Sequence, residues 1–83
     1  MLDVDSLSSD FIEQFHIQIG KNVKKAREEK GLTQLQLSQA IGHQSVTIIS
    51  RAEIFYKGQH FNLEHLAKIA YVLKVDICNF LEK

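Results

Sequence analysis

Residues 45 to 57 hold a group of polar and basic side chains whose types suit hydrogen bonding to the base edges of DNA. Arg51 can donate two hydrogen bonds to O6 and N7 of a guanine, a contact that discriminates between bases by about 1–3 kcal/mol. Thr47 can bond to a base edge or touch a thymine methyl group, whereas an aliphatic side chain can make only the methyl contact. The candidate base-contacting residues are Val46, Thr47, Ile48, Ser50 and Arg51.

The sequence contains few signs of metal binding or catalysis. The histidines His16, His43, His60 and His65 include no pair at i,i+4 on one helix, and Cys78 has no second thiol nearby, so no metal site is expected. There is no Ser-His-Asp order, glycine-rich phosphate loop or carboxylate pair. The chain is therefore expected to be neither an enzyme nor a protein that binds a cofactor or a small-molecule ligand.

Helical spacing of apolar residues predicts an all-α fold, in which helices would position the candidate base-contacting side chains. The first helix is expected to begin near Ser8–Asp10 and to end at Lys30, with Gly31 as its C-terminal stop. Gly20 lies inside this helix and is expected either to kink it or to divide it into two helices.

Capping residues predict the remaining helices. Thr33 and Gln36 form a capping box for a second helix that stops at Gly42, and Ser45 is the expected N-cap of a third helix over residues 45–54. Asn62 caps a fourth helix and Asp76 a short fifth helix. The expected inward-facing residues are Ile12, Phe15, Ile19, Val23, Ala26, Leu37, Ala40, Ile41, Ile49, Ala52, Leu63, Leu66, Ile69, Ala70, Leu73, Ile77, Phe80 and Leu81. Together they would form one compact five-helix core.

The second and third helices have the requirements of a helix-turn-helix. Gly42 can adopt the positive φ of a tight turn between them, and Ser38 is small enough for a close approach of the two helices. Apolar anchors at Leu37, Ile41 and Ile49 would fix the interhelical angle. In this arrangement the second helix rests on the DNA backbone and the third enters the major groove.

The charge distribution divides the chain into two parts, although the net charge is zero. Residues 1–16 contain four acidic and no basic residues and form an acidic arm, which is expected to be helical. Residues 17–83 contain ten basic and six acidic residues, so the expected DNA-binding domain is mildly basic. The arm has many apolar residues, which leaves two alternatives open: it packs on its own domain, or it pairs with a second chain.

The order of motifs resembles the Xre/Cro-type phage-repressor family. The resemblance includes Gly31-Leu32-Thr33-Gln34-Leu35-Gln36-Leu37-Ser38, then Ile41-Gly42, then Ser45-x-x-x-Ile49-Ser50-Arg51-x-Glu53. Ile19-Gly20-x-x-Val23-x-x-Ala26-Arg27 looks like that family's first helix, and Asn62-Leu63-x-x-Leu66-x-x-Ile69-Ala70 like its fourth. The resemblance covers about 65 residues and implies a lambda-repressor-like DNA-binding domain with a helical N-terminal extension. The turn between Gly42 and Ser45 is one residue longer than is usual in the family.

The resemblance also implies roles for particular residues. Gln34, in the first turn of the second helix, is an expected phosphate ligand, and Ser45 and Lys57 are further candidates for phosphate contacts. Arg27 and Glu53 look like the family's buried ion pair between the first and third helices. The pair is interpreted as structural.

Two functions are compatible with these observations. The first is a sequence-specific transcriptional regulator, expected to be a repressor, that binds double-stranded DNA at a pseudo-palindromic operator as a homodimer. Such a protein would be cytoplasmic and encoded by a bacterium or phage. The alternative is a protein-interaction module that keeps the fold without binding DNA, favoured by the near-neutral charge, the acidic arm and the aliphatic Val46 and Ile48. No apolar run is long enough to span a membrane.

Overall fold

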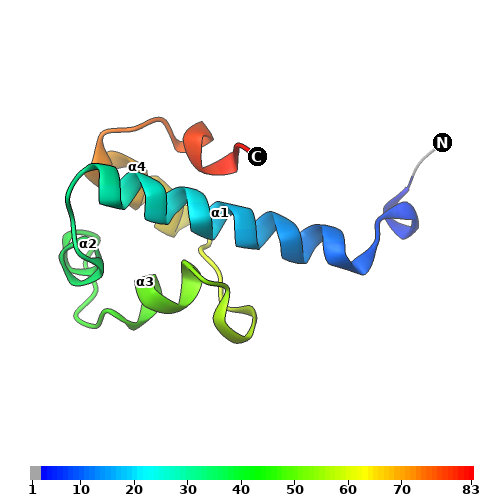
Figure 1. Cartoon of the computed structure of the whole chain (residues 1–83), viewed down its shortest axis with the longest axis horizontal. Coiled ribbons are helices and arrows are strands. Elements are labelled where there is room, and N and C mark those ends of the chain that lie inside the picture. Colours follow the sequence, from blue (N-terminus) through cyan, green and yellow to red (C-terminus); the bar gives the residue numbers. More distant parts are fainter. Residues whose placement is uncertain (1–2) are drawn as a thin grey trace.

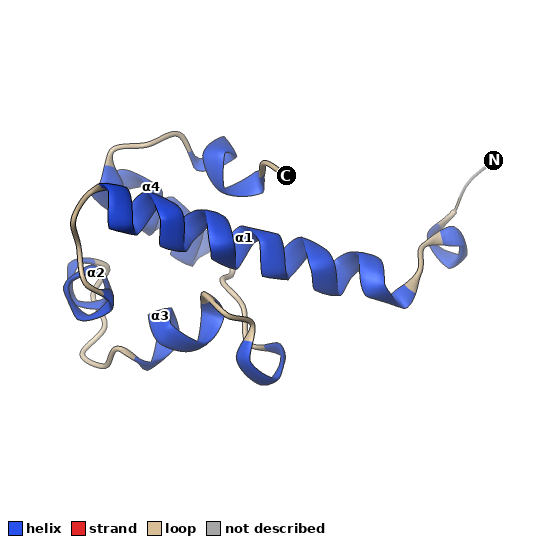
Figure 2. Cartoon of the chain, viewed as in Figure 1, coloured by secondary structure: helices blue, strands red, loops and turns tan. Residues whose placement is uncertain are grey.

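The computed structural model describes residues 3–83, and all regular elements in that range are helical (Figures 1 and 2). The all-α prediction is therefore confirmed. The α-helices are α1 (Ser9–Glu29), α2 (Gln34–Ala40), α3 (Thr47–Ala52) and α4 (Leu63–Leu73). Short 3-10 helices are η1 (Val4–Ser6), η2 (Tyr56–Gly58) and η3 (Ile77–Leu81).

Helix α1 runs without interruption for 21 residues, from the acidic arm into the body of the domain. Gly20 neither kinks nor divides it, contrary to both alternatives predicted from the sequence. The glycine instead permits a close approach to α3, because a Cβ atom at this position would lie 2.6 Å from the carbonyl oxygen of Glu53. Gly31 adopts a φ of +73° just beyond the helix, as expected of a C-terminal stop.

Capping boxes begin both α2 and α4. Thr33 Oγ1 accepts a hydrogen bond from Gln36 N at 3.0 Å, and Gln36 Oε1 accepts one from Thr33 N at 2.9 Å, so the predicted box is confirmed. Asn62 caps α4 as predicted, by accepting from His65 N at 2.7 Å. His65 Nδ1 completes the second box by accepting from Asn62 N. These local bonds fix where each helix begins.

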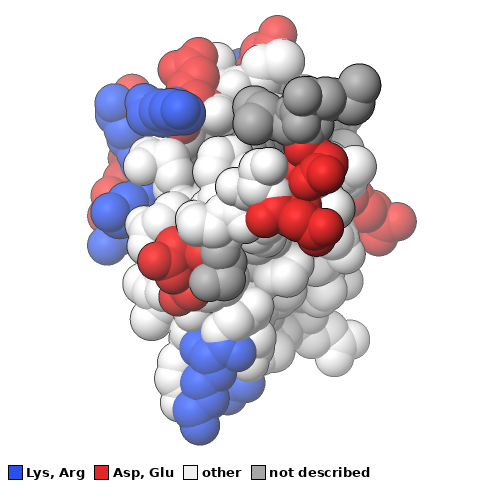
Figure 3. Space-filling model, turned by 90° about the vertical axis from the view of Figure 1, so that its right-hand side faces the viewer, with Lys and Arg blue, Asp and Glu red and all other residues white. Residues whose placement is uncertain are grey.

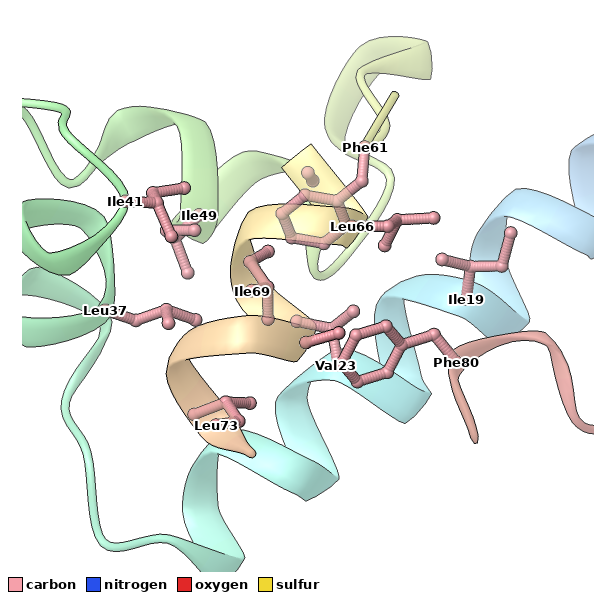
Figure 4. Close-up of a cluster of buried hydrophobic side chains, with 12 residues drawn as sticks. Ile19, Val23, Leu37, Ile41, Ile49, Phe61, Leu66, Ile69, Leu73 and Phe80 are labelled. Atoms are coloured by element: carbon pink, nitrogen blue, oxygen red, sulfur yellow. The ribbon is translucent and has the colours of Figure 1, made fainter. Parts of the chain in front are cut away.

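The hydrophobic core lies between α1, the α2–α3 pair, α4 and η3. It consists of Ile19, Val23, Leu37, Ile41, Ile49, Ala52, Phe61, Leu66, Ile69, Ala70, Leu73 and Phe80. Figure 4 shows Phe80 beside Val23 and Ile49 beside Ile41. Most of the predicted inward residues therefore belong to this core or pack against it. The exceptions are Ile12, Phe15, Ala40, Leu63 and Leu81, which are exposed.

The expected fifth α-helix is a 3-10 helix, so the prediction of five α-helices is wrong in this respect. Lys74 turns the chain after α4 with a φ of +58°, and Asp76 then accepts a hydrogen bond from Cys78 N at 2.9 Å. Short segments of this kind, here five residues, commonly form 3-10 helices. Phe80 still fills the core, and Asn22 Nδ2 of α1 donates to its carbonyl oxygen at 3.0 Å.

The N-terminal half of α1 extends past the rest of the molecule (Figure 1). The arm expected at residues 1–16 and the domain expected at 17–83 therefore share one continuous helix, and no linker separates them. No helix among residues 3–83 combines the length and the apolar character needed to cross a bilayer.

Candidate DNA-binding surface

Helices α2 and α3 form a tightly joined pair. Leu37 and Ile49 are fully buried, and Ile41 is almost fully buried. Gly42 turns the chain after α2 with a φ of +93°, a backbone conformation that residues other than glycine rarely adopt. The buried Ser38 hydroxyl donates a hydrogen bond to the carbonyl oxygen of Ser45, so the longer turn is tied back onto α2.

The start of α3 differs from the sequence prediction. The helix covers Thr47–Ala52 instead of residues 45–54, and Val46 rather than Ser45 is its N-cap. Ser45 Oγ accepts a hydrogen bond from Thr47 N at 3.2 Å and lies 2.8 Å from Thr47 Oγ1, which forms a local turn before the helix. At the other end, Phe55 adopts a left-handed φ of +55°, so the helix cannot continue.

The outward face of α3 is polar. Thr47 and Arg51 are exposed, and Ser50 and Val46 are half-buried at its margin. Ile48 is also half-buried, but it packs against the hydrophobic core. The expectation that Ile48 faces outward is therefore wrong, because its side chain contacts the core side of α3. The face has fewer aliphatic groups than the sequence suggested.

An ion pair between α1 and the end of α3 holds that face in position. Arg27 Nε donates to Glu53 Oε2 at 2.8 Å, and Arg27 Nη2 donates to Oε1 at 3.2 Å. Both residues are buried. Arg27 Nη1 also donates to the carbonyl oxygen of Leu32 at 2.7 Å, which ties the α1–α2 connection to the same group. Bidentate geometry of this kind fixes orientation as well as distance.

Gln34 belongs to the same network. Its Nε2 donates to Glu53 Oε1 at 3.0 Å, a bond that the sequence motifs did not indicate. An amide NH₂ group has two hydrogen atoms, so one remains for another acceptor. The side chain is half-buried beside the start of α2. It therefore links α2 to α3 while keeping a donor for a ligand.

Two cationic side chains, Arg51 in the last turn of α3 and Lys57 in η2, lie by the exposed ring of Tyr56. The guanidinium carbon of Arg51 is 5.5 Å from the ring centroid, and Lys57 Nζ is 5.4 Å from it. Figure 3 shows Lys and Arg side chains at the lower edge of the molecule, the edge where α3 and η2 lie in Figure 1. The sequence patterns did not predict that Tyr56 holds Arg51 and Lys57 against its ring. An aromatic residue between two cations along the chain was a usable signal for such contacts.

The histidines form two stacked or edge-on pairs rather than a metal site. His16 of α1 stacks on His60 with ring centroids 3.8 Å apart, and His43 meets His65 at 5.7 Å. Burial, and secondarily the neighbouring His60, lowers the pKa of His16 below 6.5. Burial, and then His43, lowers the pKa of His65. Within residues 3–83, no group of three or more His, Cys, Asp or Glu side chains is arranged to hold a metal ion.

Comparison with known proteins agrees with this geometry. No curated protein matches the chain. A sequence model of the helix-turn-helix family matches residues 23–80, which include every element from the middle of α1 to η3. The resemblance to Xre/Cro-type repressors is thereby confirmed. Domains of this family bind DNA. The chain belongs to the helix-turn-helix family.

Proposed function

We propose that the protein is a sequence-specific transcriptional regulator, acting as a repressor, that reads the major groove with α3. The observation that supports this most directly is the exposed pair Thr47 and Arg51 on a helix whose end is anchored by the buried Glu53 carboxylate. A rigid helix that presents a hydroxyl and a guanidinium group suits direct reading of base edges. Ser50 and Val46, at the margin of the same face, complete the proposed set of base contacts.

The phosphate backbone would be held from both sides of α3. Gln34 offers its remaining amide hydrogen from α2, and the exposed Lys57 offers its ammonium group from η2. Ser45 is exposed before α3, and its hydroxyl can exchange the bond with Thr47 for one with a phosphate oxygen. Phosphate contacts of this kind set orientation on the duplex and leave specificity to the base contacts.

The proposed regulator binds as a homodimer to a pseudo-palindromic operator. A single domain with a six-residue recognition helix reads only a short stretch of sequence. Helix-turn-helix proteins therefore commonly join two domains, which read half-sites about 34 Å apart along the duplex. Such a protein acts in the cytoplasm, where a bacterial or phage genome lies.

Selection of bound sequences from random duplex DNA tests this proposal. A two-fold symmetric sequence should be enriched, and Arg51→Ala should lower affinity for it by about tenfold to a hundredfold while relaxing the preference at one base pair. Lys25→Ala removes the same charge from the exposed side of α1 and is the matched control. Its affinity should remain close to that of the wild type. Enrichment of no sequence would contradict the proposal.

The alternative function, protein interaction without DNA binding, rests on the near-neutral charge, the acidic arm and the aliphatic Val46 and Ile48. The packing of Ile48 against the core removes one of these two aliphatic groups from the outward face. The alternative predicts no retention of duplex DNA at about 50 mM salt, where even non-specific DNA-binding proteins bind. The same binding assay therefore separates the two functions.

A further inference from the structure

Tyr56 has no part in the base and phosphate contacts proposed above, yet its ring lies against two of the side chains that make them. The guanidinium carbon of Arg51 is 5.5 Å from the ring centroid, and Lys57 Nζ is 5.4 Å from it. A cation within about 6 Å of an aromatic centroid is attracted to the negative face of the ring. The Tyr56 ring therefore contributes to where both charges lie.

Arg51 has no polar partner that would fix its side chain. The hydrogen bonds and the ion pair that guanidinium groups form within residues 3–83 all belong to Arg27. Arg51 is exposed at the end of α3, and a long exposed side chain samples many rotamers unless a neighbour restricts it. In the described part of the chain, the Tyr56 ring is the neighbour that attracts the guanidinium group.

An aromatic partner suits an arginine that has to bind DNA. A carboxylate would pair with the N–H groups of Arg51 and neutralise its charge, as Glu53 does for Arg27. A ring attracts the cation through its quadrupole and neutralises nothing. The charge and the N–H donors of Arg51 therefore stay available for O6 and N7 of a guanine.

The segment that carries Tyr56 is held against α1. Phe55 and Lys57, on either side of Tyr56, adopt left-handed φ values of +55° and +50°. Residues other than glycine keep this conformation where the surrounding structure enforces it. The Phe55 ring stacks on His16 of α1, with centroids 5.9 Å apart, and on His60, with centroids 6.3 Å apart. These contacts fix the backbone from which the Tyr56 ring projects.

We infer that Tyr56 is a positioning residue for sequence recognition, whose ring holds the Arg51 guanidinium group in the direction needed to read a guanine. The inference rests on the proposed function, because it concerns the reading of bases by α3. A side chain that is already oriented loses less conformational freedom when it binds the matching base. Unrelated DNA lacks the matching acceptors, so the Tyr56 ring should raise specificity although it touches no base.

The contact between Tyr56 and Lys57 has a different consequence. Phosphate contacts carry no sequence information, so any effect through Lys57 should be the same on all duplexes. The ratio between the affinities for the preferred operator and for an unrelated duplex therefore isolates the effect through Arg51.

Replacement of the ring tests this role on DNA, with fluorescence anisotropy on the operator selected from random duplex and on an unrelated duplex. Tyr56→Leu should lower the affinity ratio about threefold to thirtyfold, the range expected for one lost cation–π contact. Tyr56→Phe keeps a ring and should restore the ratio. In an Arg51→Ala background, Tyr56→Leu should leave the ratio unchanged. Tyr71→Leu makes the same substitution at an 86% exposed tyrosine of α4 and should match the wild type.

Nuclear magnetic resonance of the free protein tests the contact without DNA. The ring current of Tyr56 acts on the δ-methylene protons of Arg51, so Tyr56→Leu should shift their signals. Tyr56→Phe should leave these signals close to their wild-type positions. Circular dichroism checks that each variant is folded.

The outcomes separate this inference from the proposed function. Unchanged Arg51 signals in free Tyr56→Leu overturn the inference alone. So does a wild-type affinity ratio in Tyr56→Leu, or an equal loss of the ratio when Arg51 is already alanine. A wild type that selects no sequence contradicts the proposed function and overturns the role of Tyr56 in specificity with it.

Discussion

Gln34 Nε2 donates a hydrogen bond to Glu53 Oε1 at 3.0 Å, and this joins the first residue of α2 to the residue that ends α3. The same carboxylate accepts two hydrogen bonds from Arg27 of α1. One buried group therefore fixes three helices relative to one another. The orientation of the proposed reading face depends on Glu53, although Glu53 itself touches no DNA in this arrangement.

Removal of either partner of the Arg27–Glu53 pair should strongly destabilise the domain. Arg27→Ala or Glu53→Ala leaves an uncompensated buried charge, which costs about 3–5 kcal/mol of the free energy of unfolding. Urea denaturation followed by circular dichroism measures this loss. Glu64→Ala is the control, because the ion pair between Glu64 and Lys68 is exposed to solvent, with Nζ and Oε2 3.4 Å apart. This variant should change the free energy of unfolding by less than about 1 kcal/mol. If Glu53→Ala and Glu64→Ala lowered the free energy of unfolding equally, the buried network would not be structural.

Gly20→Ala should lower stability, although alanine is the better helix former by about 1 kcal/mol. The added Cβ would lie 2.6 Å and 2.7 Å from the carbonyl oxygens of Glu53 and Ala52. Backbone atoms cannot move away cheaply, so α1 and α3 must separate, and DNA affinity should fall together with the melting temperature. In Gly31→Ala, the strain of a positive φ should lower stability without displacing α3. A more stable Gly20→Ala variant would contradict the close-approach argument.

The features that could be predicted from the sequence are those that depend on a few neighbouring residues. Thr33 with Gln36, Asn62 and the glycine stops predicted most helix ends, because a cap is a local hydrogen bond or a local φ. Periodicity also predicted most of the core. The exposed Leu63 shows the limit of that signal, because an apolar residue in the first turn of α4 can point away from every neighbouring element.

The candidate site was less predictable because its details depend on contacts between distant segments. The role of Gly20 follows from the position of α3, and the packing of Ile48 follows from which side of that helix faces the core. The bond between Gln34 and Glu53 spans nineteen residues. None of these can be inferred from local spacing, since each requires the packing angle between helices.

Stability should fall in mild acid because of His16. Its ring stacks on His60, its Nδ1 has no hydrogen-bond partner among residues 3–83, and its folded pKa lies below 6.5. The unfolded chain then binds the proton more readily. The stabilising contribution of neutral His16 is complete above about pH 6.5 and is lost as the pH falls through the lowered folded pKa. Melting temperatures measured between about pH 5 and pH 8 should show this decline.

Two variants identify the groups behind that pH dependence. His16→Phe keeps an aromatic ring for stacking but cannot titrate, so its stability should decline less in acid. His60→Phe removes only the smaller cause of the shift, the neighbouring imidazole, and should lie between His16→Phe and the wild type. His65 should still contribute in both, because burial and His43 lower its pKa. An unchanged decline in His16→Phe would exclude His16 as a source.

Lys57 and Arg51 should affect DNA binding differently, although both contact the Tyr56 ring. Lys57 Nζ lies 5.4 Å and Arg51 Cζ 5.5 Å from the ring centroid. Lys57→Asn removes a charge and suits the left-handed backbone at this position, where φ is +50°. It should weaken binding to all sequences alike and reduce the slope of log affinity against log salt by about 0.9, as expected for one lost phosphate contact. Arg51→Ala should instead weaken the preferred operator more than unrelated DNA. Fluorescence anisotropy at several salt concentrations, with both duplexes, separates these effects. If Lys57→Asn changes sequence preference, the lysine contacts a base, and the division between base and phosphate contacts proposed for this surface is wrong.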